Sequence, residues 1–200
     1  MYDRPAFAEP DLDRIAALVA AHPFGLLVTA AGGLDASPIP FTVTRQGEGL
    51  LLEGHLAAGN PQCARIAAGD AALAIFGGPH AYISPSWYRT QPAVPTWDYA
   101  AVHVHGALEE MTDGDEVRAM LRALSAHDPD FAMAALPADY LAGMLRGIRA
   151  FRLRSTRIEA QWKMTQNRSI ADRQGVIAAL RAQGSADVAA LIEATLPQTG

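Results

Sequence analysis

The sequence predicts an α+β protein, mainly β, built on an antiparallel sheet that closes into a small barrel with flanking helices. Short apolar runs follow one another with glycine-containing turns between them, as in adjacent β-hairpins. The strict alternation of strand and helix that a parallel sheet requires is missing, and so are its GxGxxG and GxxxxGKS/T motifs. Because a closed sheet hides its edges, a barrel is the simplest architecture for these strands.

Capping, turn and periodicity signals divide the chain into elements. Helices are predicted at 12–22, 60–68, 117–124, 140–148, 169–182 and 186–195, and strands at 24–30, 36–43, 50–55, 71–76, 99–106 and 150–162. Asp113 and Glu116 have the spacing of a capping box, and Ser169 with Asp172 provides an N-terminal cap for the next-to-last helix.

Composition favours a globular protein. A chain of 200 residues with 50% hydrophobic and 18% charged residues can form one domain with helical additions. We expect residues 1–168 to form the barrel domain, and residues 169–200 to form a helical extension packed on the barrel or on a dimer partner. The lone Cys63 excludes an internal disulfide and has no zinc-site spacing around it. The net charge of −5 disfavours generic nucleic-acid binding.

Localisation signals are missing from the sequence. No apolar run approaches the roughly 18 residues that a transmembrane helix needs. The N-terminus lacks the basic and then apolar layout of a signal peptide. We therefore expect a cytoplasmic protein that does not associate with membranes.

Residues 77–106 concentrate polar aromatic side chains. They contain two of the three tryptophans, three of the five tyrosines and three of the six histidines. Four prolines predict that much of the segment before Tyr99 is loop, because proline fixes φ and removes a backbone donor. In the strand that follows, alternation places Tyr99, Ala101, His103 and His105 on one face and apolar residues on the other.

The aromatic segment offers walls and hydrogen-bond donors for a planar ligand. Flavins, haem and nucleobases need flat apolar walls and a few fixed donors. The side chains of these types are Tyr82, Ser84, Ser86, Trp87, Thr96, Trp97 and Tyr99. A core or a dimer interface explains the same composition equally well, so the sequence leaves the two interpretations open.

The His103-x-His105 pair raises the question of a metal site, since two imidazoles on one strand face are a common start for one. A third ligand would have to come from His55 or His80, and the sequence places no carboxylate to complete the set. We interpret the pair as half-buried histidines that are hydrogen-bonded across a sheet or a subunit interface, and we predict no metal.

Residues 163–168 form a polar cluster between the last strand and the C-terminal helices. The cluster reads Lys163-Met164-Thr165-Gln166-Asn167-Arg168, with two cations, a hydroxyl and two amides just before a helix N-terminus. Such donors suit a phosphate or another anion, and the alternative is a solvated helix cap. We favour contact with an anion.

No catalytic residue can be assigned from spacing. The sequence has no Ser-His-Asp order, no paired-carboxylate arrangement and no GxSxG motif. Whether the protein is an enzyme stays open at this point. If it is one, the chemistry is expected to come from a cofactor.

Five segments, in this order along the chain, resemble the PaiB family, also called FMN-binding negative transcriptional regulators. They are residues 1–29, GHLAAGNP (54–61), GPHAYISPSWY (78–88), VPTWDYAAVHVHG (94–106) and EAQWKMTQNRSIADRQGV (159–176). The resemblance implies a split β-barrel like that of pyridoxamine-phosphate oxidases and flavin reductases. It also implies a homodimer with FMN at the subunit interface, and a role in repressing sporulation or protease genes.

The resemblance also implies a set of cofactor-binding positions. They are His55, Asn60, Pro61, Tyr82, Ser84, Ser86, Trp87, Thr96, Trp97, His103, Lys163, Gln166, Asn167 and Arg168. In this interpretation the aromatic residues wall the pocket, the hydroxyls donate hydrogen bonds, and Lys163 and Arg168 bind the phosphate.

Departures from the family pattern keep alternatives open. The family tends to have Arg at the position of Ala58, His at that of Pro38, and Leu-Ser at that of Met164-Thr165. Without a cation at Ala58, Lys163 and Arg168 would have to bind the phosphate. The alternatives are a regulator with a vestigial cofactor site, whose binding to DNA rests on family analogy alone, a flavin-dependent oxidoreductase, and a haem-binding split barrel with an axial histidine.

Overall fold

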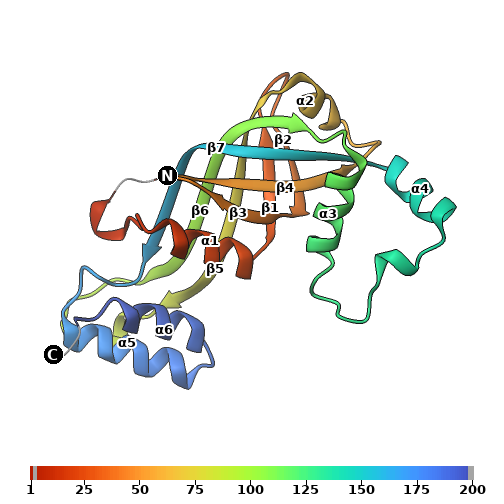
Figure 1. The fold of residues 1–200 in the computed structure, drawn as a ribbon. Coiled ribbons are helices and arrows are strands. Elements are labelled where there is room, and N and C mark those ends of the chain that lie inside the picture. The colour runs from red at the N-terminus through yellow and green to blue at the C-terminus, as the bar shows by residue number, and fades with distance from the viewer. Residues whose placement is uncertain (2–3, 198–200) are drawn as a thin grey trace. The chain divides into compact units, whose positions relative to one another are not determined.

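The computed structural model describes residue 1 and residues 4–197, which contain seven strands, six α-helices and three short 3₁₀ helices (Figure 1). The strands are β1 (Phe24–Thr29), β2 (Asp35–Pro40), β3 (Thr42–Gln46), β4 (Gly49–Ala57), β5 (Ala71–Ile83), β6 (Thr96–Glu110) and β7 (Ile148–Lys163). The helices are α1 (Leu12–Ala21), α2 (Cys63–Ala68), α3 (Gly114–Leu124), α4 (Ala138–Arg146), α5 (Ile170–Ala182) and α6 (Ala186–Ala194), with η1 (Pro5–Phe7), η2 (Pro85–Trp87) and η3 (Met133–Ala135).

The seven strands form one antiparallel sheet in the order β2-β1-β5-β6-β7-β4-β3. The hairpin ladders run from Phe24 opposite Pro40 to Thr29 opposite Asp35, and from Thr42 opposite Glu53 to Gln46 opposite Gly49. Because β2 and β3 stand at the two ends of the order, the sheet does not close as hairpin spacing alone favours, which agrees with the split barrel that the family resemblance implies. Pro38 and Pro40 lie in the end strand β2, where a missing N–H is tolerated.

The chain packs as two compact units. The described residues of 1–10, 77–102 and 159–200 form what we call the terminal unit, and residues 11–76 and 103–158 form the central unit. Strands β5, β6 and β7 pass through both units. The expected domain boundary between residues 168 and 169 stays a prediction.

Aromatic packing forms the core of the central unit. The ring of Phe41 lies edge to face with that of Phe76 at 5.2 Å and with that of Phe151 at 6.1 Å between centroids. All three rings are buried. In a second cluster, the buried side chains of Val117 and Met120 on α3 pack with those of Met111, which follows β6, and Ala150 of β7.

Aspartates begin the two longest helices of the central unit. Asp11 accepts hydrogen bonds from the N–H groups of Asp13 and Arg14 at the start of α1. Asp113 does the same for α3, where it accepts from Asp115 at 2.8 Å and from Glu116 at 3.0 Å. The cap predicted at Asp113 is therefore present, while the carboxylate of Glu116 pairs with Arg152 in place of the reciprocal bond of a capping box.

Strands extend further into the aromatic segment than the sequence predicts. β5 continues through Pro79 to Ile83, and β6 begins at Thr96, so the loop is shorter than the expected 77–98. The prediction was wrong at Pro79 because β1 pairs only with residues 72–75 of β5. Past the end of that ladder a missing N–H costs no hydrogen bond to β1.

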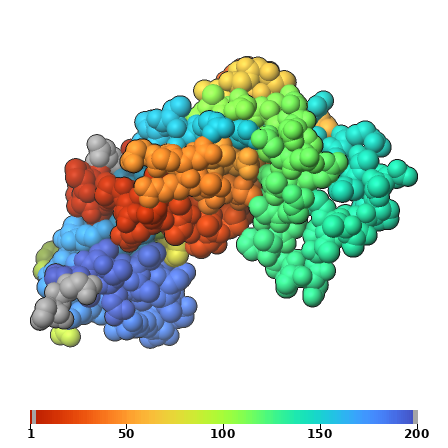
Figure 2. Space-filling view, in the orientation of Figure 1, coloured from red at the N-terminus to blue at the C-terminus, as the bar shows by residue number. Residues whose placement is uncertain are grey.

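Two helices complete the terminal unit. α5 and α6 lie side by side (Figure 1), and their side chains form one continuous blue surface in Figure 2. Ser169 caps α5 as predicted, through a bond from the N–H of Asp172. The buried Arg173 of α5 donates to the carbonyl of Ile192 at 3.4 Å and to the hydroxyl of Thr195. No helix in the described part of the chain is long and apolar enough to cross a membrane.

Candidate functional site

Two adjoining cavities open in the terminal unit. The larger, of about 450 Å³, is lined by Arg4, Phe7, Thr96, Trp97, Tyr99, Lys163 and Asn167. The smaller, of about 190 Å³, is lined by Tyr88, Val94, Pro95, Thr96, Asp98, Lys163, Thr165, Asn167 and Arg168. Because Thr96, Lys163 and Asn167 line both, the two cavities share a wall.

Three chain segments supply this wall. The first residues of β6 contribute Thr96 to Tyr99, and the last residue of β7 is Lys163. The turn between β7 and α5 contributes Thr165, Asn167 and Arg168. The polar cluster at residues 163–168 and the second half of the aromatic segment therefore meet in space, as the anion and planar-ligand interpretations together require.

Lys163 is held at the shared wall by three acceptors. Its ammonium group donates to the hydroxyl of Thr96 at 2.7 Å, to the backbone carbonyl of Trp97, and to Oδ1 of Asp98 at 3.3 Å. An ammonium group has three N–H donors, so these bonds use all of them. In this arrangement Lys163 contributes positive charge to the site while its donors remain within the protein.

Asp98 is fully buried beside Lys163. Its side chain is 0% exposed, and it shares the buried face of β6 with Ala100, Val102 and Val104. Burial raises the pKa of Asp98 to about 6, although the ion pair with Lys163 and, to a smaller extent, the nearby N–H and hydroxyl groups of Thr165 oppose that shift. Oδ2 has no hydrogen-bond partner among the described residues. Sequence reasoning missed this residue, although a lone carboxylate on the apolar face of a strand is a signal that alternation provides.

Tyr88 and Arg168 pack against each other at the smaller cavity. The guanidinium carbon of Arg168 lies 4.4 Å from the centroid of the Tyr88 ring, which is a cation–π contact. The Tyr88 hydroxyl is buried and finds no hydrogen-bond partner in the described part of the chain. Burial raises the pKa of this phenol. The sequence placed Tyr88 in the aromatic segment without assigning it a role.

Thr165 adopts a conformation that is rare for its residue type. Its φ is +53°, in the left-handed region that a β-branched side chain disfavours. The side chain is buried, and its hydroxyl donates to the carbonyl of Met164 at 2.8 Å. The N–H of Arg168 donates to the carbonyl of Thr165 at 2.9 Å, so this strained residue fixes the turn that carries Arg168.

The larger cavity has flat apolar walls. Trp97 is 55% exposed, and its ring lies 6.0 Å from the ring of Tyr82 and 6.2 Å from that of His80. Phe7 is buried, and the hydroxyl of Tyr99 donates to Oε1 of Gln161 at 3.1 Å. Such a cavity suits a planar ring system that stacks on an indole.

The structure separates the predicted site residues into two groups. Those it brings together around the cavities are Thr96, Trp97, Lys163, Asn167 and Arg168. Other predicted residues make local contacts: the hydroxyl of Ser84 is 2.8 Å from that of Ser86 and accepts from its N–H, capping η2. Gln166 spans its own turn, accepting from the N–H of Met164 and donating to the carbonyl of Trp162.

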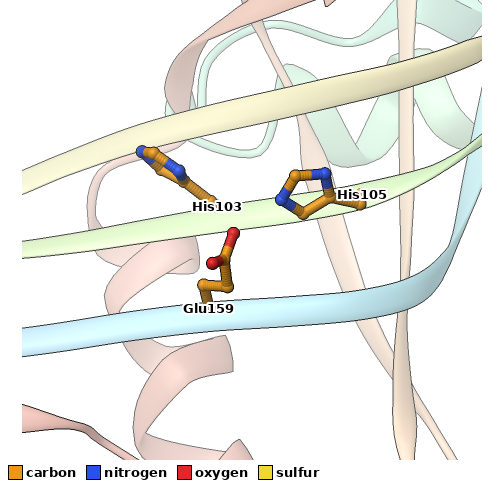
Figure 3. Close-up of side chains that lie close together, drawn as sticks. All are labelled: His103, His105 and Glu159. Carbon is orange, nitrogen blue, oxygen red and sulfur yellow. The ribbon is translucent and has the colours of Figure 1, made fainter. Parts of the chain in front are cut away.

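Two predicted histidines belong to the central unit. His55 lies on β4, and burial lowers its pKa. His103 and His105 rise from the same strand, β6, and Glu159 rises from β7 (Figure 3). Arg157 lies 3.1 Å from Nδ1 of His105, which agrees with the interpretation of hydrogen-bonded histidines. The absence of a metal stays a prediction.

Comparison with known proteins gives one family and one fold. Residues 1–157 match the family described as "Putative FMN-binding domain". The chain is 34% identical over 186 residues to the protease synthase and sporulation protein PAI 2 of Bacillus subtilis, an alignment that covers 90% of this chain and 89% of that protein.

Solved structures share the split-barrel fold at low identity. A protein of Bacteroides thetaiotaomicron described as a "putative 5-nitroimidazole antibiotic resistance protein" matches with a TM-score of 0.59 and 13% identity over 77% of this chain and 85% of that one. A FAD- and haem-binding protein of Mycobacterium smegmatis matches with a TM-score of 0.60 and 20% identity over 78% of this chain and 73% of that one.

Proposed function

Because the chain belongs to the FMN-binding domain family, we propose that the two cavities of the terminal unit together bind FMN. One observation carries the proposal: a cavity with flat aromatic walls adjoins a smaller, polar cavity that carries Arg168. A flavin has the same two parts, a planar ring system and a hydroxylated chain that ends in phosphate. When bound, FMN would supply the electron transfer of which side chains are incapable.

The residues at the cavities have distinct roles in this proposal. Trp97 and Tyr99 provide flat surfaces for the ring system, and Phe7 closes the apolar side. Arg168 provides the donors for the phosphate, since those of Lys163 are used by protein acceptors. His55, Tyr82, Ser84, Ser86, Trp87, His103 and Gln166 stay predictions as cofactor contacts.

Titration with FMN tests the proposal. We expect flavin fluorescence to change on binding and the melting temperature to rise with FMN concentration, because a ligand that binds only the folded state stabilises it. Trp97→Ala should weaken FMN binding about tenfold by removing a stacking surface. Phe131→Ala is the matched control, since Phe131 is an exposed aromatic residue that lines neither cavity.

Two results would contradict the proposal. In one, the wild-type protein is colourless as purified, and FMN changes neither flavin fluorescence nor melting temperature. In the other, Phe131→Ala weakens FMN binding as much as Trp97→Ala, which would place the ligand away from the cavities.

We consider two alternative roles for the bound flavin. As an oxidoreductase the protein would oxidise NADH or NADPH in the presence of FMN. As a regulator it would bind DNA, and retardation of its own upstream DNA at low salt would support that role. The net charge of −5 disfavours binding to DNA.

Other expectations from the sequence stay predictions. The homodimer is supported by the exposure of Trp97, Tyr82 and Val94 in the terminal unit, where a second copy could cover them. Haem binding is tested by the appearance of a Soret band on addition of hemin. The cytoplasmic location rests on the sequence alone.

A further inference from the structure

Two buried polar atoms of the smaller cavity lack hydrogen-bond partners. They are Oδ2 of Asp98, on a side chain that is 0% exposed, and the hydroxyl of Tyr88, and neither has a partner among residues 1 and 4–197. Buried polar groups in proteins are almost always paired, because an unpaired one loses its hydration without compensation. Two such atoms at one cavity indicate that a ligand or ordered water completes their bonding.

The charges around the cavity define the ligand further. A carboxylate oxygen only accepts hydrogen bonds, so Asp98 requires an O–H or N–H group on the ligand. Arg168 is a cation with several donors, so it favours an anionic group. The ligand part that enters this cavity therefore carries both a hydroxyl or amine and a negative charge.

The size of the cavity agrees with a short, polar chain. A volume of about 190 Å³ is that of roughly six water molecules in the liquid. This space is less than half of that in the larger cavity, which has a volume of about 450 Å³. A hydroxylated chain ending in phosphate satisfies the donor, the charge and the volume together.

We propose that the smaller cavity recognises the hydroxylated chain of the flavin, and that Asp98 determines specificity by accepting a hydrogen bond from one of its hydroxyl groups. The proposal rests on the proposed function and concerns which planar ligands the site selects. A planar ligand whose only polar groups are carboxylates offers Asp98 no donor and places a second negative charge beside it. Such a ligand, haem included, is therefore disfavoured at this site.

Lys163 fixes the orientation that makes Asp98 selective. Its ammonium group holds Oδ1, which leaves Oδ2 as the oxygen available to a ligand. In Asp98→Asn the same ammonium group would hold the amide oxygen, so the NH₂ group would replace Oδ2. The substitution then exchanges an acceptor for a donor at nearly constant shape.

The experiment compares riboflavin with lumiflavin, which has the same ring system with a methyl group in place of the ribityl chain. The wild-type protein should bind riboflavin about tenfold more tightly than lumiflavin, as expected for one hydrogen bond to a charged acceptor. In Asp98→Asn this ratio should fall toward one, while the affinity for lumiflavin stays the same. The affinity for hemin should rise in the same variant.

Two further variants sharpen the test. Tyr88→Phe removes only the unpaired hydroxyl and keeps the ring under Arg168, so it should lower the ratio by a smaller factor of about two to five. Asp139→Asn makes the same chemical change as Asp98→Asn at an exposed position on α4 that lines neither cavity, and it should leave the ratio unchanged. Circular dichroism checks that each variant is folded.

The outcomes separate the two proposals. If FMN, riboflavin and lumiflavin all fail to bind the wild-type protein, the proposed function and the role of Asp98 both fail. If FMN binds but riboflavin binds no more tightly than lumiflavin, the role of Asp98 is overturned while FMN binding stands. If both ligands bind and Asp98→Asn leaves the ratio unchanged or raises it, the role of Asp98 is overturned while flavin binding stands.

Discussion

Asp98 is the most deeply buried carboxylate in the described part of the terminal unit. Its side chain is fully buried, and its one ion-pair partner, Lys163, also serves two neutral acceptors. Taking a carboxylate out of water is costly unless hydrogen bonds replace the hydration, and here only one oxygen is paired. The folded protein therefore retains part of the desolvation cost of Asp98, and a hydrogen bond from a ligand to Oδ2 would offset it.

Asp98 should make the stability of the protein depend on pH. Its pKa is about 6 in the folded state, above the ordinary value of 3.8, so its contribution is fully present below about pH 4 and is lost as the pH rises through 6. The loss amounts to roughly 3 kcal/mol by pH 8. Asp98→Asn lacks this group, so the free energy of unfolding of the variant minus that of wild type should increase between pH 4 and pH 8.

Urea unfolding at a series of pH values measures this difference. Loss of the ion pair with Lys163 changes the free energy of unfolding of the variant by a constant amount. The titration of Asp98 changes how the difference between the two proteins varies with pH. A difference that is the same at every pH would show that Asp98 titrates alike in the folded and unfolded chains.

The sequence singled out residues whose type and neighbours indicate their chemistry. It missed residues whose chemistry depends on their burial in the fold. Lys163, Asn167 and Arg168 stood out because several donors precede a helix. Asp98 and Tyr88 did not, because their importance depends on the pairing of individual buried atoms, which no spacing reveals. For Asp98 the apolar alternation of β6 was an available signal.

At the scale of elements, one close approach attaches the segment around η2 to α5. Asp172 of α5 accepts hydrogen bonds from the N–H groups of Arg89 and Thr90, at 2.8 and 2.9 Å. These bonds lower the pKa of Asp172. One turn further, Gly175 faces the backbone carbonyl of Trp87, with no room between them for a Cβ atom. This contact fixes the position of Tyr88, the residue after Trp87.

Gly175→Ala should destabilise the protein by about 1–3 kcal/mol, because the added methyl group meets a backbone atom that cannot turn away. Gly143→Ala on α4 is the matched control. The Cβ atom there meets only the end of Arg146, at 3.8 Å, and alanine favours the helix by up to about 1 kcal/mol. Thermal unfolding of the two variants should therefore shift in opposite directions. A stabilised Gly175→Ala would mean that η2 does not pack on α5 as described.

Elements were predicted well where capping and periodicity agree. α3 and α5 begin at the expected caps because an aspartate or serine side chain bonds the first free N–H groups locally, and α1 begins at the predicted residue 12. The extent of β5 was missed, because the cost of Pro79 depends on whether a neighbouring strand needs its N–H. That depends on sheet order, which is a property of the whole chain.

At the scale of the whole molecule, the sheet and the division into units organise the site. Hairpin spacing alone favours a closed antiparallel barrel, but the sheet ends at β2 and β3. The split barrel that the family resemblance implies is confirmed by the solved structures that share the fold. Both candidate cavities are lined entirely by residues of the terminal unit, from three segments that lie far apart in the sequence. The sequence could list these segments, but only the fold brings them together.

Binding of FMN should therefore protect the chain unevenly in hydrogen exchange. Amides in residues 86–99 and 163–168 should exchange more slowly with FMN, because the ligand restricts local opening where it makes contacts. Amides of α3 and α4, in the central unit, should change little and serve as the internal control. Equal protection of α3 and α4 would show that FMN acts through global stabilisation or binds elsewhere. Protection at Phe7 and Trp97, which line only the larger cavity, with none at Tyr88 and Arg168, which line only the smaller one, would place the ring system in the larger cavity and leave the smaller one without the chain.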